Sequence, residues 1–429
     1  MDDPGTRGAP LAAAPDRATR GSLLAFASIS TAALFNFMAI GSVLPVLPLY
    51  VKGPVGAGDV AVGVVIGAFA FTAAIARPLG GRLADSALRK LVLMVGLAIC
   101  SAGGAMLFLP LDVPGLVLAR LVVGFGDGWV FTAGVAWIVD LTPEERRGQA
   151  IGVFGIAVWG GISLGTVFGQ LIFSGAGYDW VWAFAAIAPL VGLAVSVWTP
   201  AGRPVRQSPL EEVATAEMGA PMPSPDEAPA ATRPAREGSW LPAGAIRPGI
   251  ALGLANVGFG TIAGFIVLLL DSRGIGHGAA AFTLYTAGVV LTRLFFGWIP
   301  DRWGARRSAL AGGIFQTAGI VAIGSATTLP AALIGAGLTG IGSSLIFPSL
   351  ALIVVNATDP AARATAMGWF TSFFDVGVAL GAPFAGLVAS VGGGENYPAA
   401  FYAAAAVCLA GALIGFFGTR GSARRASVA

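Results

Sequence analysis

Residues 77–85 read Arg-Pro-Leu-Gly-Gly-Arg-Leu-Ala-Asp, and residues 293–301 read Arg-Leu-Phe-Phe-Gly-Trp-Ile-Pro-Asp. The two stretches keep Arg, Gly and Asp in one register, at an offset of 216 residues. The same offset superposes further residues of the two halves: Gly124 and Gly126 on Gly340 and Gly342, Arg147 and Gly152 on Arg363 and Gly368, and Gly161 and Gly165 on Gly377 and Gly381. One constant offset over several segments indicates an internal duplication.

The composition identifies the repeated unit as a set of membrane helices. Of 429 residues, 56% are hydrophobic and 11% are charged, whereas a soluble domain carries about 25% charged residues. Apolar runs of roughly 20 residues, long enough to span a bilayer, recur near 23–49, 60–80, 91–110, 115–139, 148–172, 181–199, 249–270, 279–299, 308–328, 331–355, 363–390 and 398–418. We predict an all-α membrane protein with twelve transmembrane helices in two pseudo-symmetric six-helix bundles.

The charges predict how the chain is oriented. We divide it into a disordered cytoplasmic N-terminal tail (1–22), a first bundle (23–200), a Pro-rich cytoplasmic linker (201–247), a second bundle (248–418) and a cytoplasmic C-terminal tail (419–429). Most of the 25 Lys and Arg residues lie in the tails, the linker and the loops on the same side, whereas only Lys52 and Arg273 fall in loops on the other side. The positive-inside rule therefore places both termini in the cytoplasm. Abundant Arg, Ala and Gly are typical of a GC-rich bacterial genome, so we expect a bacterial cytoplasmic membrane.

The scarcity of reactive side chains argues against an enzyme. His277 is the only histidine, and Cys100 and Cys408 both lie within apolar runs. The sequence has no nucleotide-binding Gly-x-x-x-x-Gly-Lys-Ser/Thr motif and no apparent nucleophile–base set. We therefore expect no metal, no cofactor and no nucleic-acid partner. The expected partners are a small-molecule substrate, protons and membrane lipids, and the chain is expected to function as a monomer.

Three segments resemble signatures of the major facilitator superfamily, and the likeness extends over all twelve spans. They are Gly81-Arg-Leu-Ala-Asp85-Ser-Ala-Leu-Arg89-Lys90, its second copy Gly297-Trp-Ile-Pro-Asp301-Arg302-Trp-Gly304-Ala-Arg306-Arg307, and Arg120-Leu-Val-Val-Gly124-Phe-Gly126. The nearest subgroup resembles the twelve-helix drug:proton antiporters. This chain departs from the helix-5 signature of that subgroup, because Thr166 stands where the signature has a proline and Gln170 where it has a glycine.

The resemblance implies a gate at the cytoplasmic ends of the bundles. It implies that Asp85 faces the start of span 11 and that Asp301 faces the start of span 5, while Asp140 is placed to pair with Arg89. The candidate gate residues are Gly81, Asp85, Arg89, Asp140, Gly297, Asp301 and Arg306. The alternative is that these charges only set the topology.

Two acidic residues lie deep in predicted spans, Asp127 in span 4 and Asp375 in span 11. A charged group there costs about 2.5–3.5 kcal/mol on insertion scales, so its presence indicates a function. We predict that both carboxyl groups bind protons and that Arg120, two turns from Asp127, tunes the proton affinity of Asp127. The alternatives are a purely structural Arg–Asp pair and, for Arg120, an anchor for an anionic substrate group.

Further polar and aromatic residues are candidates for lining a central substrate cavity. Asn36 and Asn256 occupy related positions in spans 1 and 7, and an asparagine that faces lipid is costly. The full set of candidates is Asn36, Asn256, Phe131, Tyr285, Trp159, Gln170, Gln316 and Trp369. For the aromatic residues, the alternative is packing or anchoring at the membrane interface.

The function predicted from these features is secondary active transport by alternating access. We expect proton-coupled efflux of a small organic, amphipathic compound. One alternative is proton-coupled uptake of a sugar or an organic acid. An alternative of another class is a non-transporting membrane receptor or assembly factor, although a receptor would leave Asp127 and Asp375 unexplained.

Overall fold

The computed structural model describes residues 17–84, 88–109, 111–143, 146–199, 243–358 and 363–418. These residues form helices and no strand, and twelve of the helices are long and apolar enough to cross a membrane. The first half contains α1 (Arg17–Val43), α2 (Leu47–Lys52), α3 (Asp59–Ala84), α4 (Arg89–Ala105), the short 3₁₀ turn η1 (Met106–Phe108), α5 (Asp112–Asp140), α6 (Arg147–Ala176) and α7 (Tyr178–Trp198). The second half contains α9 (Ala243–Ser272), α10 (Gly278–Phe296), α11 (Ile299–Trp303), α12 (Ala305–Ser325), α13 (Leu329–Asn356), α14 (Arg363–Ala389) and α15 (Tyr397–Phe417).

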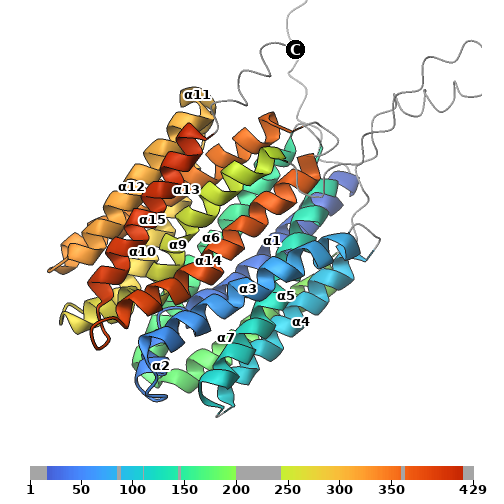
Figure 1. The fold of residues 1–429 in the computed structure, drawn as a ribbon. Coiled ribbons are helices and arrows are strands. Elements are labelled where there is room, and N and C mark those ends of the chain that lie inside the picture. Colours follow the sequence, from blue (N-terminus) through green and yellow to red (C-terminus); the bar gives the residue numbers. More distant parts are fainter. Residues whose placement is uncertain are drawn as a thin grey trace, which may run out of the picture.

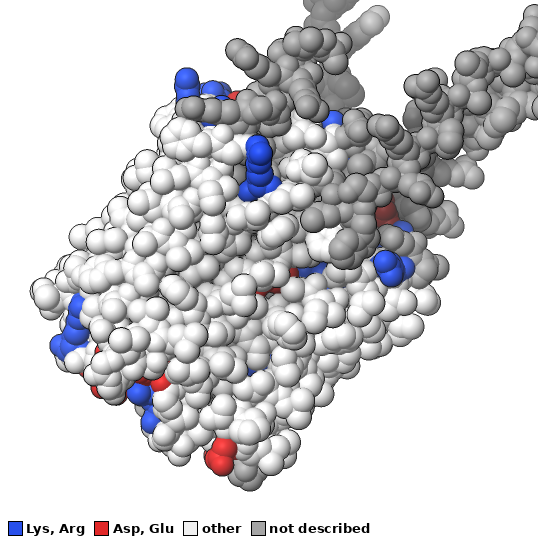
Figure 2. Space-filling view, viewed as in Figure 1, with Lys and Arg blue, Asp and Glu red and all other residues white. Residues whose placement is uncertain are grey.

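The long helices lie side by side, with the first half against the second (Figure 1). The start of α1 and the end of α15 lie at the same end of the assembly, which the charge pattern predicts to be cytoplasmic. Most charged side chains on the visible face lie near the two ends, and a broad, almost uncharged band separates them (Figure 2). Such a band is what a surface in contact with lipid tails requires, because hydrocarbon cannot solvate charge.

Two helices begin about one turn before the bundle boundaries predicted from the sequence. α1 begins at Arg17 and α9 begins at Ala243, so residues 17–22 and 243–247 are helical, whereas the sequence pattern assigns them to the N-terminal tail and the linker. A membrane helix can extend past its apolar core into the polar interface, where hydropathy no longer marks it. In α9, Arg247 Nη1 supports this extension by donating a hydrogen bond to the carbonyl of Gly418 at 2.8 Å. Residues 1–16, 200–242 and 419–429 of the predicted tails and linker lie outside the described residues.

Glycines at equivalent positions of the two halves make equivalent contacts. A Cβ atom on Gly165 of α6 would overlap the backbone of Met38 in α1. Its counterpart Gly381 of α14 would place a Cβ atom 2.6 Å from Val257 Cα in α9. The missing side chains therefore let α6 approach α1, and α14 approach α9, at backbone distance. Each half of the duplicated sequence thus forms a bundle with the same internal packing.

The two bundles contact each other most closely along α3 and α14, near the predicted outer end. Gly63 of α3 lies against the backbone of Ala382 and Pro383 in α14, and Gly386 lies against the backbone of Asp59. The Asp59 carboxylate is buried and accepts hydrogen bonds from the backbone N–H of Glu395 at 2.8 Å and from the hydroxyl of Tyr397 at 3.3 Å. Polar contacts and close backbone packing thus hold the bundles together at this end.

Candidate proton and substrate site

The centre of the site is Arg77 of α3, which reaches from the first bundle to the second. Its Nε donates a hydrogen bond to Asp375 Oδ2 at 2.6 Å, and its Nη2 donates to Asp375 Oδ1 at 3.2 Å. Nη2 also lies 3.8 Å from Oδ2 of Asp127 in α5. The guanidinium group stacks over the ring of Phe131, 4.4 Å from the ring centre. One cation therefore bridges two buried carboxylates that belong to different bundles.

Asn36 of α1 completes the polar contacts of Asp127. Its Nδ2 donates a hydrogen bond to Asp127 Oδ1 at 3.0 Å, and the side chains of both residues are buried. Asp127 Oδ2 has no hydrogen bond among the described residues, and its ion-pair contact there is Arg77 Nη2 at 3.8 Å. The hydrogen bonds of the Asp127 carboxylate are therefore incomplete.

Small residues of α5 explain why Arg77 arrives beside Asp127. A Cβ atom on Gly124 would overlap the backbone of Phe69 in α3, and one on Gly128 would lie 3.3 Å from the backbone nitrogen of Arg77. α3 therefore crosses α5 at backbone distance on the two turns that flank Asp127. This crossing delivers the Arg77 side chain to the boundary between the bundles, where Asp375 of α14 meets it.

Comparison with known proteins agrees with this architecture. The family model described as Major Facilitator Superfamily matches residues 29–279 and 248–428. The chain belongs to the Major Facilitator Superfamily. Members of this superfamily are membrane transporters rather than enzymes, so this chain is a transporter too. An uncharacterized MFS-type transporter of Salmonella typhimurium (strain LT2) is 28% identical over 394 residues, covering 90% of this chain and 94% of the relative.

Solved structures with this fold include two transporters of different description. A bacterial homolog of the human lysosomal transporter Spinster, in an inward-facing and unoccupied conformation, has a TM-score of 0.71 and 16% identity, covering 96% of this chain and 99% of that one. A human organic anion transporter has a TM-score of 0.65 and 17% identity, covering 92% and 99%. At these identities the likeness shows the shared fold.

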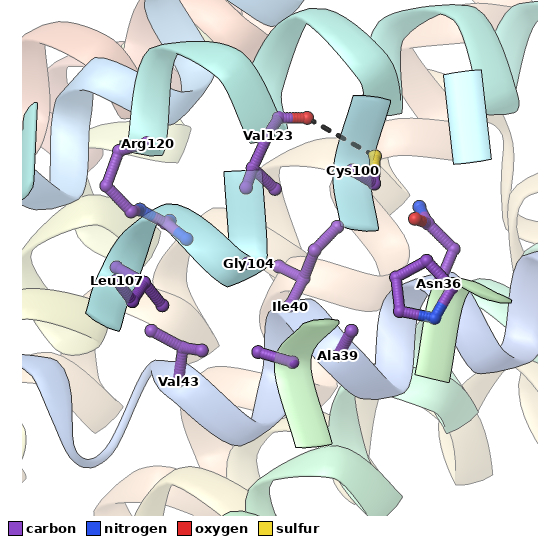
Figure 3. A pocket seen from close by; sticks show the side chains of 11 residues that line it. Asn36, Ala39, Ile40, Val43, Cys100, Gly104, Leu107, Arg120 and Val123 are labelled. Atoms are coloured by element: carbon purple, nitrogen blue, oxygen red, sulfur yellow. Dashed lines mark hydrogen bonds between the residues drawn. The ribbon is translucent and has the colours of Figure 1, made fainter. Parts of the chain in front are cut away.

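In this member of the superfamily, Arg120 lies apart from the carboxylates. Its guanidinium group packs over the ring of Phe69 at 4.9 Å, and its Nε is buried without a hydrogen bond. It lines a small cavity of about 20 Å³ inside the first bundle, together with Asn36 and Cys100 (Figure 3). Among the described residues Arg120 has no ion pair, so it does not contact Asp127 directly; two helical turns separate the residues along α5.

Four of the eight candidate cavity residues form two pairs. Asn36 and Phe131 lie around Arg77, whereas Trp159 and Tyr285 meet at the boundary between α6 and α10, with ring centres 6.4 Å apart. The remaining candidates lie elsewhere. Asn256 bonds to the carbonyl of Leu252 in its own helix at 2.8 Å.

The last three candidates lie on α6, α12 and α14. Gln316 is buried inside the second bundle, where its Nε2 donates to the carbonyl of Ala255 at 2.8 Å. Gln170 and Trp369 are partly buried on α6 and α14. Asn36 and Asn256 are equivalent in the sequence but differ in their hydrogen bonds. Asn36 bonds to Asp127, whereas Asn256 bonds within its own helix, because Asp127 has no acidic counterpart in the second bundle.

The described gate residues interact within their own bundles. Arg89 forms an ion pair with Asp140 and donates a hydrogen bond to the carbonyl of Ala84 at 2.8 Å. Arg306 donates to the carbonyl of Phe416 at 2.6 Å. None of the gate residues that the structure describes has a hydrogen bond or ion pair to the other bundle. These contacts therefore hold the helix ends of each bundle together.

The contacts implied for the acidic members of the gate signature involve residues outside the described ones, at 85, 144–145 and 359–362. Asp301 is exposed on α11 and, among described residues, has no ion pair, while Asp85 lies outside the described residues. Among the described residues, a Cβ atom on Gly81 would contact Thr132, and one on Gly297 would contact Arg293, both within the same bundle. The gate role of all seven residues stays a prediction from the family resemblance.

Arg77 is the central residue of this candidate site, and it is absent from the candidate site residues predicted from the sequence. The signal was present, because Arg77 and Arg293 are both arginines within predicted spans, at equivalent positions of the repeat. A cation within a membrane span is costly unless it has a partner, and span 4 and span 11 each offer one acidic residue. Sequence spacing alone favours a pairing within span 4, whereas the contact between α3 and α14 determines the actual pair.

Proposed function

We propose that this transporter couples the inward movement of protons to the export of a small organic, amphipathic compound across the bacterial cytoplasmic membrane. In this proposal Asp127 and Asp375 are the proton-binding groups and Arg77 is the cation that they share. The observation that carries the proposal is the bridge from Arg77 to both carboxylates, because it connects the proton sites to the contact between the bundles.

Protonation would weaken the bridge in a defined order. Asp375 holds Arg77 through two hydrogen bonds, and charge-assisted bonds of this kind are roughly twice as strong as neutral ones. A proton on Asp375 removes the negative charge and one acceptor site, so Arg77 is released toward Asp127, 3.8 Å away. The cation then belongs to the first bundle alone, and α14 is free to move relative to α3.

This sequence of events fits alternating access. In transporters built from two repeats, the substrate site lies near the middle of the membrane and the halves rock around it. Asp127 and Asp375 lie near the middle of α5 and α14. The protonation of Asp127 and Asp375 would therefore decide whether Arg77 links the two bundles at the depth where the substrate binds.

The test is transport by the purified full-length protein in liposomes with an imposed pH gradient. A chemically diverse panel of compounds would be tested, and we expect the transported compound to move in the direction opposite to the protons. A dye trapped inside the liposomes would report the accompanying change in pH. Asp127→Asn and Asp375→Asn should each lose pH-driven transport and retain substrate exchange. Asp179→Asn is a matched control, because it removes an exposed carboxylate at the start of α7.

Three outcomes contradict the proposal. Substrate flux that is indifferent to the pH gradient would exclude proton coupling. Full pH-driven transport by both Asp127→Asn and Asp375→Asn would exclude these carboxyl groups as the proton sites. Accumulation of substrate in the direction of proton movement would instead establish uptake and overturn the proposed direction.

A further inference from the structure

The duplication supplies a second position equivalent to the one that Arg77 occupies. Arg293 of α10 stands 216 residues after Arg77. The same offset relates the two acidic partners of Arg77 to Ser343 and Trp159. The repeat therefore keeps the arginine, whereas the equivalents of the two carboxylates are neutral: Ser343 in the second bundle and Trp159 in the first.

The surroundings of Arg293 agree with this difference. Its guanidinium carbon lies 6.0 Å from the ring centre of Phe347, and its Nη1 faces Gly155 of α6, 2.9 Å from the position of a Cβ atom there. Within the described part of the chain Arg293 has neither a hydrogen bond nor an ion pair. It therefore presents a partly buried and uncompensated positive charge at the boundary between α6 and α10.

Deep in the described spans, positively charged residues outnumber negatively charged ones. Arg77, Arg120 and Arg293 are the cations, and Asp127 and Asp375 are the anions. Arg77 contacts both carboxylates, so neither is available to Arg293. A buried charge without a counter-ion is unfavourable, and a bound anion would supply the missing charge.

Neutral groups beside Arg293 add hydrogen-bonding capacity. Tyr285 lies close to both Arg293 and Ser343. The Ser343 hydroxyl oxygen is buried and lacks a hydrogen bond of ordinary geometry. A guanidinium group with hydroxyl groups nearby is a suitable donor set for a carboxylate or another oxyanion.

An aromatic surface adjoins this polar group. The ring of Trp159 lies 5.8 Å from that of Phe259 and 6.4 Å from that of Tyr285, and the Phe259 ring lies 6.4 Å from that of Phe374. These rings come from α6 of the first bundle and from α9, α10 and α14 of the second. Flat apolar groups pack favourably on such rings in offset or edge-on arrangements.

We propose that Arg293 binds the anionic group of the transported compound and that Trp159, Phe259 and Tyr285 pack on its ring system. The substrate class is then an organic anion with an aromatic or flat apolar body. The inference rests on the proposed transport function and specifies its substrate. Arg293 and Trp159 lie on different bundles, so the substrate contacts both halves when it binds.

The probes for this inference share a naphthalene ring and carry a negative, a neutral and a positive substituent. We would measure equilibrium binding of radiolabelled 2-naphthoate, 2-naphthamide and 2-naphthylmethylammonium to the purified full-length protein in detergent. The carboxylate should bind most tightly. In Arg293→Gln its advantage over the amide should fall about 10- to 100-fold, because one or two charge-assisted hydrogen bonds are lost. Arg293→Lys should keep part of the advantage.

The control removes an equal charge from a distant site. Arg247→Gln eliminates an exposed arginine that bonds to Gly418, and it should leave the carboxylate preference unchanged. Size-exclusion profiles and melting temperatures would confirm that the Arg293 variants are folded. Equal binding of the carboxylate and its amide by the parent protein would overturn the inference, as would an unchanged preference in Arg293→Gln.

This readout separates the inference from the proposed proton coupling. Binding in detergent requires no pH gradient, so a carboxylate preference that depends on Arg293 supports the inference even if transport proves insensitive to protons. Conversely, pH-driven transport of the ammonium probe but not of the carboxylate would leave proton coupling intact and overturn the assignment of Arg293.

Discussion

Arg77 on α3 and Asp375 on α14 are joined by two hydrogen bonds, of 2.6 and 3.2 Å, across the boundary between the six-helix bundles. The two residues are far apart in the chain and belong to different copies of the repeat. Their contact makes the pairing of a buried charge depend on how the bundles are arranged. Movement of one bundle against the other must therefore break the pair or carry Arg77 to a new partner.

Arg77→Gln should destabilise the protein more than either Asp127→Asn or Asp375→Asn. It leaves Asp127 and Asp375 buried together without their shared cation, and removing one partner of a buried pair costs about 3–5 kcal/mol. The melting temperature in detergent should fall clearly. Addition of Asp375→Asn to Arg77→Gln should recover stability, because one of the two uncompensated carboxylates is then removed. A double variant no more stable than Arg77→Gln would show that the network is not coupled in this way.

Asp127→Asn should have a smaller effect on stability than Asp375→Asn. The structure leaves Arg77 with its two bonds to Asp375 when Asp127 is neutral, whereas loss of the Asp375 charge weakens both bonds. Hydrogen bonds to charged groups contribute about 1.5–3 kcal/mol, which sets the expected scale for Asp375→Asn. Thermal melts of the two variants under identical conditions would decide the order. A larger loss in Asp127→Asn would contradict the observed geometry.

Asp59→Asn should favour opening at the predicted outer end. Asp59 lies between Lys52, whose Nζ is 3.0 Å away, and the Glu395 and Tyr397 donors of the second bundle. Neutralisation removes the ion pair and weakens the hydrogen bonds that cross the boundary. Spin labels on the α2–α3 and α14–α15 loops should report a larger population at long distances. The exposed Asp179→Asn provides a comparison at the same end, and identical distance distributions in Asp59→Asn and the parent would refute a closing role for Asp59.

Gly124→Val should disrupt the crossing of α3 and α5. A side chain there would overlap the Phe69 carbonyl and the Thr72 hydroxyl of α3. Overpacking of this kind costs about 1–3 kcal/mol, and it should also move Arg77 away from Asp127. Gly160→Val is the matched control, because nothing lies within 4 Å of a Cβ atom at Gly160. We expect loss of folded protein and of pH-driven transport in Gly124→Val only. Equal behaviour of the two variants would contradict the proposed crossing.

The sequence by itself determined the class of protein, the duplication and the depth of the key carboxylates. Apolar runs of spanning length are a property of consecutive residues, so they predict twelve membrane helices without any knowledge of their neighbours, and the structure confirms them. The offset of 216 residues likewise predicts two related bundles, and it aligns Gly165 with Gly381, which make equivalent helix contacts. Asp127 and Asp375 were recognisable because acidic residues are costly within a span.

Only the tertiary structure decided which charges meet. Spacing along span 4 brings Arg120 to the same helix face as Asp127, yet Arg120 packs on Phe69 and Arg77 takes its place beside the carboxylate. The physical reason is that an ion pair depends on the crossing of α3 with α5 and α14, and side-chain periodicity in one helix carries no information about that crossing. The same holds for Arg293, which lies against Gly155 of α6 and Phe347 of α13 and has no counter-ion among the described residues.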